Sequence, residues 1–543
     1  MTLRATFLAS TTVLTLALGT AAVAESHVMA GDTLAPAAQQ IFRSRELDEF
    51  PSIDPSLIQD VSGNDVARQL FEGLMNQDKD GNLVPGVATG FTVSDDKMTY
   101  TFNLRPEARW SNGEPVKAAD FVYAWRRAAD PATASEYSWY MSLMSIENVD
   151  AVIAGDMPPD QLGVSAPDDR TFVVQLSQPL PYFPQMVVVA TTFPILESNV
   201  VEFGDAWTQP GNMVSNGAYV LTERVQQEKL VMERNPMYWD DDNTHINQVT
   251  YLIINDENAA LTRYLAGELD KTEVPAGQYP RLLAEYPTQT LSVPLLCSYY
   301  YALNLSDSGP EALKDVRVRQ ALSLAVDRDI IVDNVLQGGQ KPAYSFTHWA
   351  TAGFEMPAIP AASMTQAERN AKAAELMTEA GYGAGGEPLS LELLYNTSEA
   401  HKSVAVAISQ MWKQTLGVEI TLNNQEWQTF LDDRGNQRFQ IARGGWCGDY
   451  NEASTFTDLM TSTSGYNDSK YVNPEVDALA ADARTSDNPQ ADYEQIEQII
   501  AVDTPIIPIY HYAANKMLND KIRNWPVNNV QQNYYVKDLY VAE

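Results

Sequence analysis

The chain has 543 residues, 45% of them hydrophobic, and a formal net charge of -35 at pH 7. This length allows two or three domains with ample hydrophobic cores. So acidic a surface repels phosphate backbones and anionic headgroups, which argues against nucleic acids and membrane surfaces as partners.

The amino terminus predicts export from the cytoplasm. Arg4 precedes an apolar run over residues 7–18, and the small residues Ala22 and Ala24 frame a cleavage site. We therefore expect a signal peptide over residues 1–24, cut after Ala24. The apolar run is too short to be a permanent membrane anchor, and no cysteine follows it to accept a lipid. The mature protein is expected to be free and soluble outside the cytoplasm.

Sequence periodicity predicts strands and short helices in the first 300 residues. Tyr100, Phe102 and Leu104 alternate with polar residues, as is typical of a half-buried strand. A helix is expected to begin at Asp120 and to stop before Pro131. The other expected elements are strands at 171–176, 247–255 and 290–305 and a short helix at 261–270.

The strand at 290–305 carries three consecutive tyrosines. Side chains alternate between the two faces of a strand, so Tyr299 and Tyr301 should share one face and Tyr300 should lie on the other. The three rings therefore cannot all line the same cavity.

Helix signals dominate the region after residue 310. Residues 315–336 have the apolar spacing of a helix. Thr365 and Glu368 form a capping box for a second helix, which is expected to end at Gly381. A GxGxxG match begins at that glycine, but it follows a helix instead of joining a strand to a helix. We interpret it as a helix cap and a loop, not as a nucleotide site.

A β-α-β sequence comes next. A strand at 389–396, a helix at 401–416 and a strand at 418–424 imply a parallel pair of strands and thus an α/β domain. Ligand sites in such sheets lie beyond the carboxyl ends of the strands. Glu426 and Trp427 fall at that position.

The segment 442–454, ARGGWCGDYNEAS, concentrates groups that suit a ligand with both charges. Two adjacent glycines, Gly444 and Gly445, let another backbone approach closely. Our hypothesis is that Asp449 meets the α-ammonium of a peptide and that Arg443 meets or steers its carboxylate. The alternative is that these two side chains pair with each other on a loop.

The two cysteines of the chain, Cys297 and Cys447, predict a disulfide. Pairing is the simplest interpretation for an exported protein, and the alternative is two unpaired buried thiols. The long loop that the bond would close corresponds to roughly 4 to 5 kcal/mol in the chain-entropy argument. The bond would also join the segment around Asp449 to the strand at 290–305.

No motif points to catalysis. The sequence lacks P-loop, HExxH and GxSxG motifs, and its carboxylates are too numerous to single out an acid–base pair. The five histidines show no metal spacing, although a site assembled in space stays open. Ten tryptophans and 26 tyrosines suit the recognition of varied ligands, although most of them are expected to pack in the core. We expect no cofactor and no enzyme.

Several motifs resemble those of the periplasmic oligopeptide-binding proteins of ABC importers, along essentially the whole mature sequence. LFEGL and ERNPMYWD resemble marks of the wider peptide, nickel and glycoside-binding group. LLYNTS, NQEW and GWCGDYNE resemble the oligopeptide branch more specifically. These motifs stand at 70–74, 233–240, 393–398, 424–427 and 445–452.

This resemblance implies an α/β fold of two lobes and three domains, with mixed sheets flanked by helices and a ligand cleft between the lobes. Domain I would be split into three segments, domain II would be inserted in it, and domain III would form the second lobe. The expected bounds are 25–71, 200–296 and 513–543 for domain I, 72–199 for domain II and 297–512 for domain III. Such proteins bind short peptides in extended form by main-chain pairing.

The resemblance also implies roles for individual residues. They are Asp449 for the α-ammonium, Arg443, Arg434 and His401 for the peptide carboxylate, Tyr140, Trp427 and Trp446 as pocket walls, and Gly445 and Val61 as backbone partners. The family disulfide would join Cys297 and Cys447. The chain also departs from the family pattern. Gln59 and Ala302 replace expected glutamates, Leu336 replaces an expected lysine, and TEVP at 272–275 replaces an asparagine-rich turn.

The leading interpretation is a periplasmic peptide-binding protein that delivers its ligand to an inner-membrane ABC permease. We expect a monomer without a membrane anchor. A second interpretation keeps the fold but takes a murein peptide, an amino-acid conjugate or another small solute such as a glycoside. A third is an exported hydrolase that uses an unrecognised site.

Overall fold

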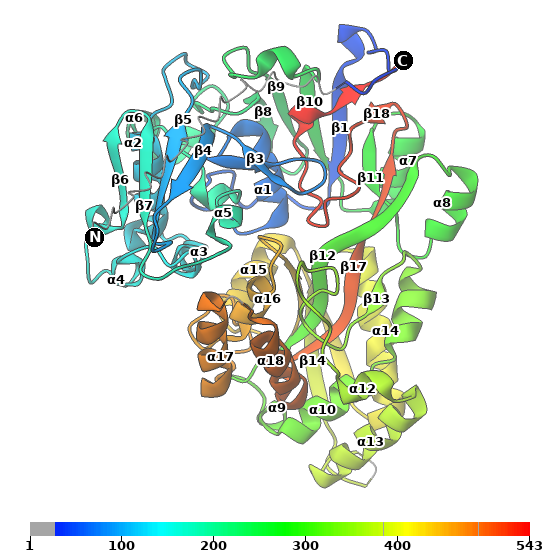
Figure 1. Cartoon of the computed structure of the whole chain (residues 1–543). Helices are drawn as coiled ribbons and strands as arrows, with labels where there is room; N and C mark the ends of the chain where they lie inside the picture. Colours follow the sequence, from blue (N-terminus) through cyan, green and yellow to red (C-terminus); the bar gives the residue numbers. More distant parts are fainter. Residues whose placement is uncertain (1–27, 384, 487) are drawn as a thin grey trace, which may run out of the picture.

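The computed structural model describes residues 28–383, 385–486 and 488–543 of the chain. The expected signal peptide, residues 1–24, lies outside the described residues. The described chain forms two lobes, one above the other in Figure 1. Both chain ends of the described part belong to the upper lobe. Among the described residues, no helix combines the length and the apolar character needed to cross a membrane.

Two long antiparallel strands connect the lobes. They are β12 (Thr290–Leu303) and β17 (Ile506–Leu518), and they run side by side from the upper lobe into the lower one (Figure 1). Their register shifts between Pro294 and Ser298. On the upper side of this shift β17 pairs with β11 (Lys271–Glu273), and on the lower side β12 pairs with β16 (Ile441–Cys447).

One eleven-stranded sheet continues through both lobes. Beyond β11 in the upper lobe lie β1 (Ile41–Glu46), β10 (Gln248–Ile253), β9 (Lys229–Arg234) and β8 (Tyr219–Val225). Beyond β16 in the lower lobe lie β14 (Ser390–Asn396) and β15 (Glu419–Gln425). The sheet is mixed, because β1 is parallel to both its neighbours while most other pairs are antiparallel. The predicted fold class is therefore confirmed.

The β-α-β unit of the lower lobe forms as predicted. Strands β14 and β15 are parallel, and helix α14 (Glu399–Leu416) joins them. The helix begins two residues earlier than expected because Ser398 caps it, with its hydroxyl accepting from the backbone N–H of His401. Helix α15 (Trp427–Gly435) then starts directly after β15, at the strand end where ligands are expected.

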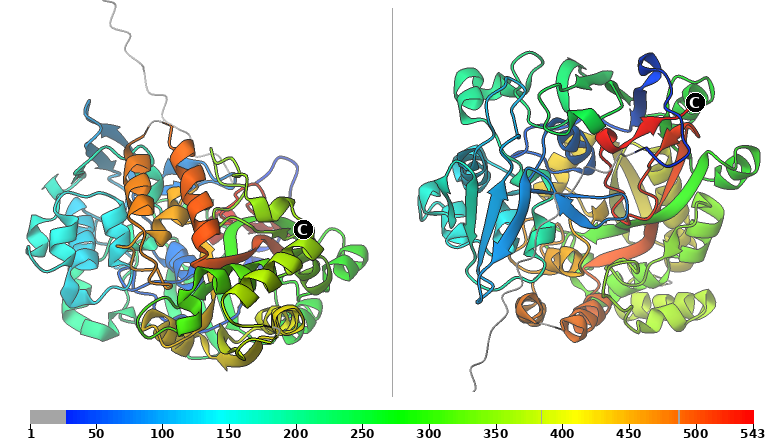
Figure 2. Two further views of the ribbon diagram at one scale, coloured as in Figure 1. Left: turned by 90° about the horizontal axis from the view of Figure 1, so that it is seen from below. Right: turned by 45° about the horizontal axis from the view of Figure 1, so that its top comes forward.

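A second sheet of four antiparallel strands stands beside the rest of the upper lobe (Figure 2). Its order is β4 (Ala88–Val93), β5 (Thr99–Leu104), β7 (Thr171–Gln175) and β6 (Val164–Asp168). The predicted inward face of β5 is confirmed, since Tyr100, Phe102 and Leu104 are all buried. Helix α2 (Ala118–Ala129) packs against strands β6 and β7 of this sheet, and α3 (Ser138–Leu143) packs against α2.

Two further predicted helices begin earlier in the structure than expected. Helix α2 begins at Ala118 because Asp120 occupies its third position, where its carboxylate accepts from the backbone N–H of Lys117. The predicted helix at 261–270 is α7 (Glu257–Leu265), which starts early because Asp256 caps it.

The predicted helix at 315–336 is wrong as a single element. It consists of α10 (Val316–Leu324), a new start at α11 (Arg328–Ile330) and a π-helical turn (Ile331–Leu336). Asp327 caps the new start, and the guanidinium of Arg328 is buried against backbone carbonyls. The cap and these long-range contacts outweigh the apolar periodicity.

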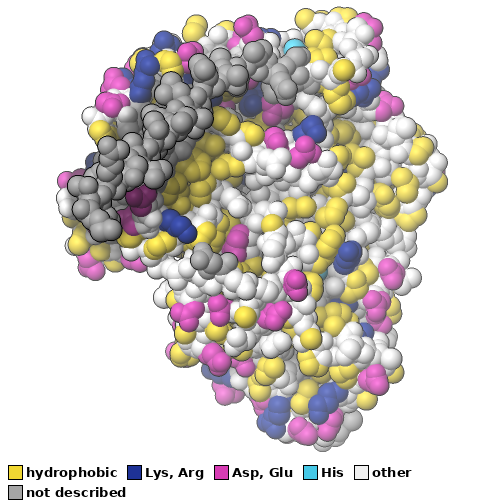
Figure 3. Space-filling model, viewed as in Figure 1, with side chains coloured by type: hydrophobic (Ala, Val, Ile, Leu, Met, Phe, Trp, Pro, Cys, Tyr) yellow, Lys and Arg dark blue, Asp and Glu magenta, His cyan; other side chains and the backbone are white. Residues whose placement is uncertain are grey.

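The remaining main helices cover the two lobes. They are α1 (Val61–Leu70) in the upper lobe and α13 (Gln366–Glu379), α17 (Pro474–Thr485) and α18 (Gln490–Asp503) in the lower lobe. The capping box at the start of α13 is confirmed, and the GxGxxG match after it is a loop. Acidic side chains are spread over the visible face of both lobes (Figure 3), in line with the large negative charge.

The three tyrosines of β12 divide between the two faces as predicted. Tyr299 and Tyr301 pack against each other and into the core of the lower lobe, with ring centroids 6.0 Å apart. Tyr300 faces the opposite way and packs edge-on against Phe346. Strand β12 therefore offers different rings to its two sides.

Candidate functional site

A cavity of about 440 Å³ lies between the lobes, within the size range of small-molecule sites. The upper lobe contributes α1, the ends of β1 and β11, and the segment before the carboxyl terminus. The lower lobe contributes β16, the start of α15, and residues next to α14. From the upper lobe the lining includes Val61, Asp65, Lys271 and Tyr534, and from the lower lobe His401, Trp427, Arg443 and Gly445.

Asp449 is half-buried between the lobes. It follows the last residue of β16 by two positions, and its carboxylate accepts a hydrogen bond from the hydroxyl of Tyr137 at 2.6 Å. Tyr137 stands just before α3 in the upper lobe, so this bond crosses the interface. Burial raises the pKa of Asp449 from its ordinary value of 3.8 to about 7, although Tyr137 and the charge of Arg68 act in the opposite direction.

Two further acids make hydrogen bonds from the upper lobe to the lower one. Asp60, the cap of α1, accepts from the indole N–H of Trp427 at 3.0 Å. Glu257 accepts from the hydroxyl of Ser398 at 3.1 Å. Burial is the first cause that raises the pKa of both acids, to about 6 for Asp60. The closed interface therefore disfavours negative charge at each of these bridging acids.

Arg443 is buried in the cavity wall, and one of its amino groups donates to the hydroxyl of Tyr512 at 2.7 Å. Its Nε has no hydrogen-bond partner among the described residues. The guanidinium also lies over the ring of Tyr299, 5.1 Å from the centroid. In the part of the chain that the structure describes, Arg443 and Asp449 form no ion pair with each other. The alternative in which they pair on a loop is therefore wrong.

The two glycines of β16 leave room for the chain's own side chains. A Cβ at Gly444 would lie 2.4 Å from the ring of Tyr300. A Cβ at Gly445 would lie 2.7 Å from the guanidinium of Arg443. Gly445 also lines the cavity, so its backbone is accessible to a ligand. Gly445 thus makes room for the guanidinium of Arg443, and Gly444 makes room for the ring of Tyr300.

The other predicted ligand contacts divide into two groups. Val61, Trp427 and His401 line the cavity together with Arg443. Burial and the charge of Arg443 hold the pKa of His401 well below its ordinary value, so its imidazole is neutral. The Nδ1 of His401 has no partner among the described residues. A neutral imidazole can donate one hydrogen bond to a ligand carboxylate, but it supplies no positive charge.

Like Asp449, the predicted contacts Arg434, Tyr140 and Trp446 lie outside the lining of this cavity. Arg434 forms an ion pair with Asp468 at 3.2 Å. The hydroxyl of Tyr140 donates to the carbonyl of Met186. Trp446 packs against Trp139 of the upper lobe, with ring centroids 5.9 Å apart.

The predicted disulfide is confirmed. Cys297 and Cys447 are direct partners on the neighbouring strands β12 and β16, and their sulfurs are 2.01 Å apart. Both residues line the cavity. The bond therefore fixes the strand that carries Arg443 to the strand that connects the lobes.

The positions where the chain departs from the family pattern lie close to the site. Gln59 accepts a hydrogen bond from the hydroxyl of Tyr466 across the interface at 3.4 Å. Leu336 and residues 273–275 line the cavity, whereas Ala302 is buried within β12. At Gln59 a neutral amide thus replaces the expected charge.

Sequence reasoning missed two groups of residues. Tyr137, the partner of Asp449, precedes Tyr140 by three positions, and the aromatic run at 137–140 was its only signal. The second group consists of charged residues of the upper lobe. Glu46, Asp65, Lys271 and Lys516 line the cavity from four separate segments, so no local pattern joins them.

The two lobes, their paired connecting strands and the cavity between them define the class of two-lobed solute-binding proteins. Residues 82–468 match the family described as "Bacterial extracellular solute-binding proteins, family 5 Middle". The chain belongs to this family.

Individual relatives match along almost the whole chain. The periplasmic murein peptide-binding protein MppA of Escherichia coli is 45% identical over 500 residues, which cover 91% of this chain and 92% of MppA. The periplasmic oligopeptide-binding protein OppA of Salmonella typhimurium is 43% identical over 534 residues, which cover 96% of this chain and 97% of OppA. A structure of Haemophilus influenzae OppA in complex with the peptide RPPGFSPFR has a TM-score of 0.89 at 37% identity and covers 94% of this chain and 100% of that one.

Two structures of MppA show which arrangement of the lobes this chain has. The structure of the Escherichia coli murein tripeptide-binding protein has a TM-score of 0.90 at 44% identity and covers 93% of this chain and 98% of that one. An unliganded open form of MppA has a TM-score of only 0.69 at 43% identity, with 95% and 99% coverage. Identity and coverage are almost equal, so the lobes of this chain are arranged differently from those of the open form.

Proposed function

We propose that this protein is the periplasmic binding component of a peptide ABC importer. It captures short peptides in extended form between its closing lobes and delivers them to an inner-membrane permease. The observation that carries this proposal is Asp449, a half-buried carboxylate that bonds to Tyr137 where the lobes meet. The similarity to oligopeptide-binding proteins supports it.

In this proposal the two charges of a peptide are met separately. Asp449 receives the α-ammonium, and Arg443 receives or steers the carboxylate, with His401 as a neutral hydrogen-bond partner. Val61 and Gly445 offer backbone groups to the ligand main chain, and Trp427 forms a wall. Such main-chain pairing does not depend on the ligand sequence. Arg434, Tyr140 and Trp446 support the walls from outside the cavity, and their direct contact with larger ligands stays a prediction.

Closure follows from differential binding. A ligand that touches both lobes favours the closed arrangement only as far as it binds that arrangement better. Without a ligand, closing withdraws the charge of Asp449 from water, and among the described residues its carboxylate bonds only to the hydroxyl of Tyr137, which is costly. The peptide ammonium removes this cost.

Calorimetry with tri- to pentapeptides tests the proposal. We expect saturable one-to-one binding of peptides with free amino ends. The absence of binding for every peptide length would contradict it. Incubation of the same peptides with the protein should leave them intact, whereas cleavage would support the hydrolase interpretation.

A murein peptide is the second candidate ligand, favoured by the 45% identity to MppA. Competition between a murein tripeptide and an unmodified tripeptide of L-amino acids separates the two candidates. Displacement of the murein peptide only at a large excess of the unmodified peptide would identify this chain as a murein peptide-binding protein.

The remaining features of the proposal concern the whole protein. We propose cleavage after Ala24, release into the periplasm and a monomeric state. We also propose the domain bounds 25–71, 200–296 and 513–543 for domain I, 72–199 for domain II and 297–512 for domain III. The position of β12 and β17 supports these bounds, because the chain passes between the lobes near residues 297 and 512.

A further inference from the structure

One half-buried cation of the cavity wall has no part in the recognition of the peptide ends. Lys516 lies on β17 in the upper lobe, lines the cavity and is half-buried. Its ammonium donates to the side-chain carbonyl of Gln532 at 3.3 Å and lies over the ring of Trp525, 4.8 Å from the centroid. Among the described residues it forms no ion pair.

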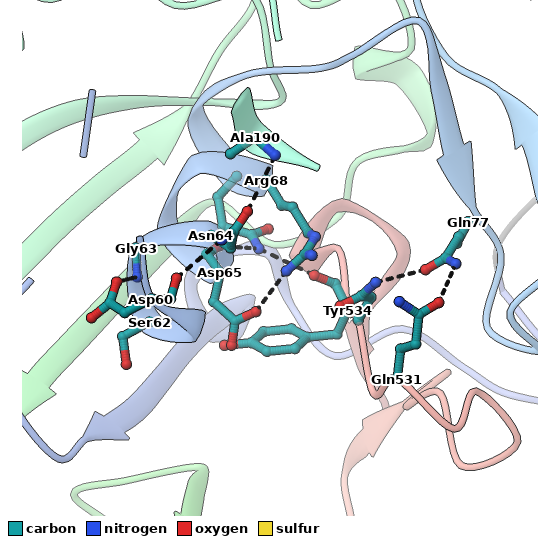
Figure 4. Close-up of polar contacts among 12 residues, drawn as sticks. Asp60, Ser62, Gly63, Asn64, Asp65, Arg68, Gln77, Ala190, Gln531 and Tyr534 are labelled. Carbon is teal, nitrogen blue, oxygen red and sulfur yellow. Dashed lines mark hydrogen bonds and ion pairs between the residues drawn. The ribbon is translucent and has the colours of Figure 1, made fainter. Parts of the chain in front are cut away.

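The carboxylates around Lys516 are engaged by other cations. Glu273, its cross-strand neighbour on β11, forms ion pairs with Arg45 at 2.9 Å and with Lys271 at 3.6 Å. Asp65 of α1 pairs with Arg68 at 3.0 Å, as Figure 4 shows.

Glu46 of β1 is the third of these acids, and its carboxylate lies 4.0 Å from the ammonium of Lys271. Together the three acids leave Lys516 as the cation of the upper-lobe wall that, among the described residues, lacks a carboxylate of its own. A charge in such a position is costly unless a partner arrives.

Hydrogen bonds and adjacent residues connect Lys516 to the segment that carries Asp449. Gln532, the partner of Lys516, is adjacent to Gln531, whose amide donates to the carbonyl of Gly448 at 2.9 Å. Gly448 directly precedes Asp449. Gln531 is in turn held by Gln77, and this pair and α1 lie on either side of Tyr534 in Figure 4. An atom that meets Lys516 therefore belongs to the part of the ligand near its amino end.

We propose that Lys516 receives a carboxylate on a ligand side chain, so that the protein prefers short peptides with an acidic residue near the amino end. This inference rests on the proposed function, because it assumes that Asp449 holds the α-ammonium. A carboxylate would complete the ion pair that Lys516 lacks, and charge-assisted hydrogen bonds of this kind are the strong ones.

The protonation of this wall gives an independent signature. Burial and the charge of Lys271 lower the pKa of Lys516 to about 7, against the charges of Glu273, Asp65 and Glu46. Burial raises the pKa of Glu46 to about 7 as well. A ligand anion raises both pKa values. The protein therefore takes up protons near pH 7 when an acidic peptide binds, whichever of the two groups accepts them.

Matched peptides test the proposal. Calorimetry compares Ala-Glu-Ala with Ala-Gln-Ala, and the same exchange of glutamate for glutamine is made at the first and third positions. We expect the glutamate peptide to bind at least tenfold more tightly at one of the first two positions. The binding of the glutamate peptide should also be coupled to a larger proton uptake than the binding of the glutamine peptide. Titrations in buffers of different ionisation enthalpy measure this uptake.

Variants assign this preference to the side chain. In Lys516→Met the affinities of the glutamate and glutamine peptides should lie within twofold of each other. In Lys516→Arg the preference for the glutamate peptide should return. Lys521→Met removes an exposed lysine beyond the end of β17 and should keep the ratio. A ratio within twofold at every position in the unmodified protein, or a preference that survives in Lys516→Met, would overturn the inference alone. If no peptide binds, the proposed function fails and this inference fails with it.

Discussion

Replacing Asp449 by asparagine removes one charge and almost no volume. The hydroxyl of Tyr137 can still donate to the amide oxygen, and the backbone N–H of Asp449 keeps its bond to Thr455. The variant is therefore expected to fold with unchanged or slightly higher stability, because a buried carboxylate is lost. Any large change in peptide affinity then reports on the charge itself.

The structure sets the size of the effect. The pKa of Asp449 rises from 3.8 to about 7, and each pKa unit corresponds to about 1.4 kcal/mol. Burying the ionised carboxylate without a counter-ion thus costs about 4 kcal/mol. Removing one partner of a buried charge pair typically costs 2 to 5 kcal/mol in binding. Taking the lower limit of that range and the cost of about 4 kcal/mol given above, we expect Asp449→Asn to weaken the binding of a free tripeptide by about 30-fold to 1000-fold.

Calorimetry with a tripeptide and its N-acetylated form isolates the contact. The unmodified protein should bind the acetylated form at least tenfold more weakly, because that form cannot present an ammonium. In Asp449→Asn the two forms should bind within about threefold of each other. Equal affinity of both forms for the unmodified protein would refute the role of Asp449, and so would a variant that keeps full discrimination.

The same carboxylate predicts how closure of the empty protein depends on pH. A carboxyl group whose pKa is higher in the closed state stabilises that state below its ordinary pKa, and this contribution is lost as the pH rises through about 7. The raised pKa values of Asp60 and Glu257 act in the same direction. Fluorescence transfer between dyes on the two lobes should therefore report more closed protein at pH 4 than at pH 8. In Asp449→Asn this difference should shrink, whereas an opposite trend in the unmodified protein would contradict the reasoning.

Three further predictions concern neighbouring residues. Tyr137→Phe removes the hydroxyl that crosses the interface, so the empty protein should be more open at equilibrium by small-angle scattering, and an unchanged profile would contradict this. Arg443→Met should weaken the binding of free tripeptides more than that of their carboxyl-terminal amides, and calorimetry should show equal losses if Arg443 does not serve the carboxylate. The double variant Cys297→Ser, Cys447→Ser should lose roughly 4 kcal/mol of unfolding free energy in denaturant titrations, given the 150-residue separation, and an unchanged midpoint would show that the disulfide is not stabilising.

Local periodicity was sufficient to predict the structure where a pattern within one continuous segment decides which side chains face the core. The inward face of β5 and the opposite faces of Tyr299 and Tyr300 depend on alternation, and the structure has both. The capping box of α13 is equally local. Periodicity failed at 315–336 because a buried arginine, Arg328, bonds to distant carbonyls and breaks the helix.

The site was only partly predictable for the same reason. Arg443, Gly445 and Cys447 lie in one short segment, so the sequence could point to them together. Tyr137 meets Asp449 only because the lobes close. The wall around Lys516 collects residues from β1, α1, β11 and β17, and no spacing rule connects the first two elements with β11 and β17, which follow hundreds of positions later.

The most direct test of the account is a crystal structure of the protein with a bound tripeptide. If Asp449 holds the amino end of the peptide, the amino nitrogen of the ligand should lie about 2.7 to 3.0 Å from a carboxylate oxygen of Asp449, between closed lobes. A ligand whose amino group points to solvent, or whose amino group is held by another acid while Asp449 stays bonded to Tyr137 alone, would contradict the account.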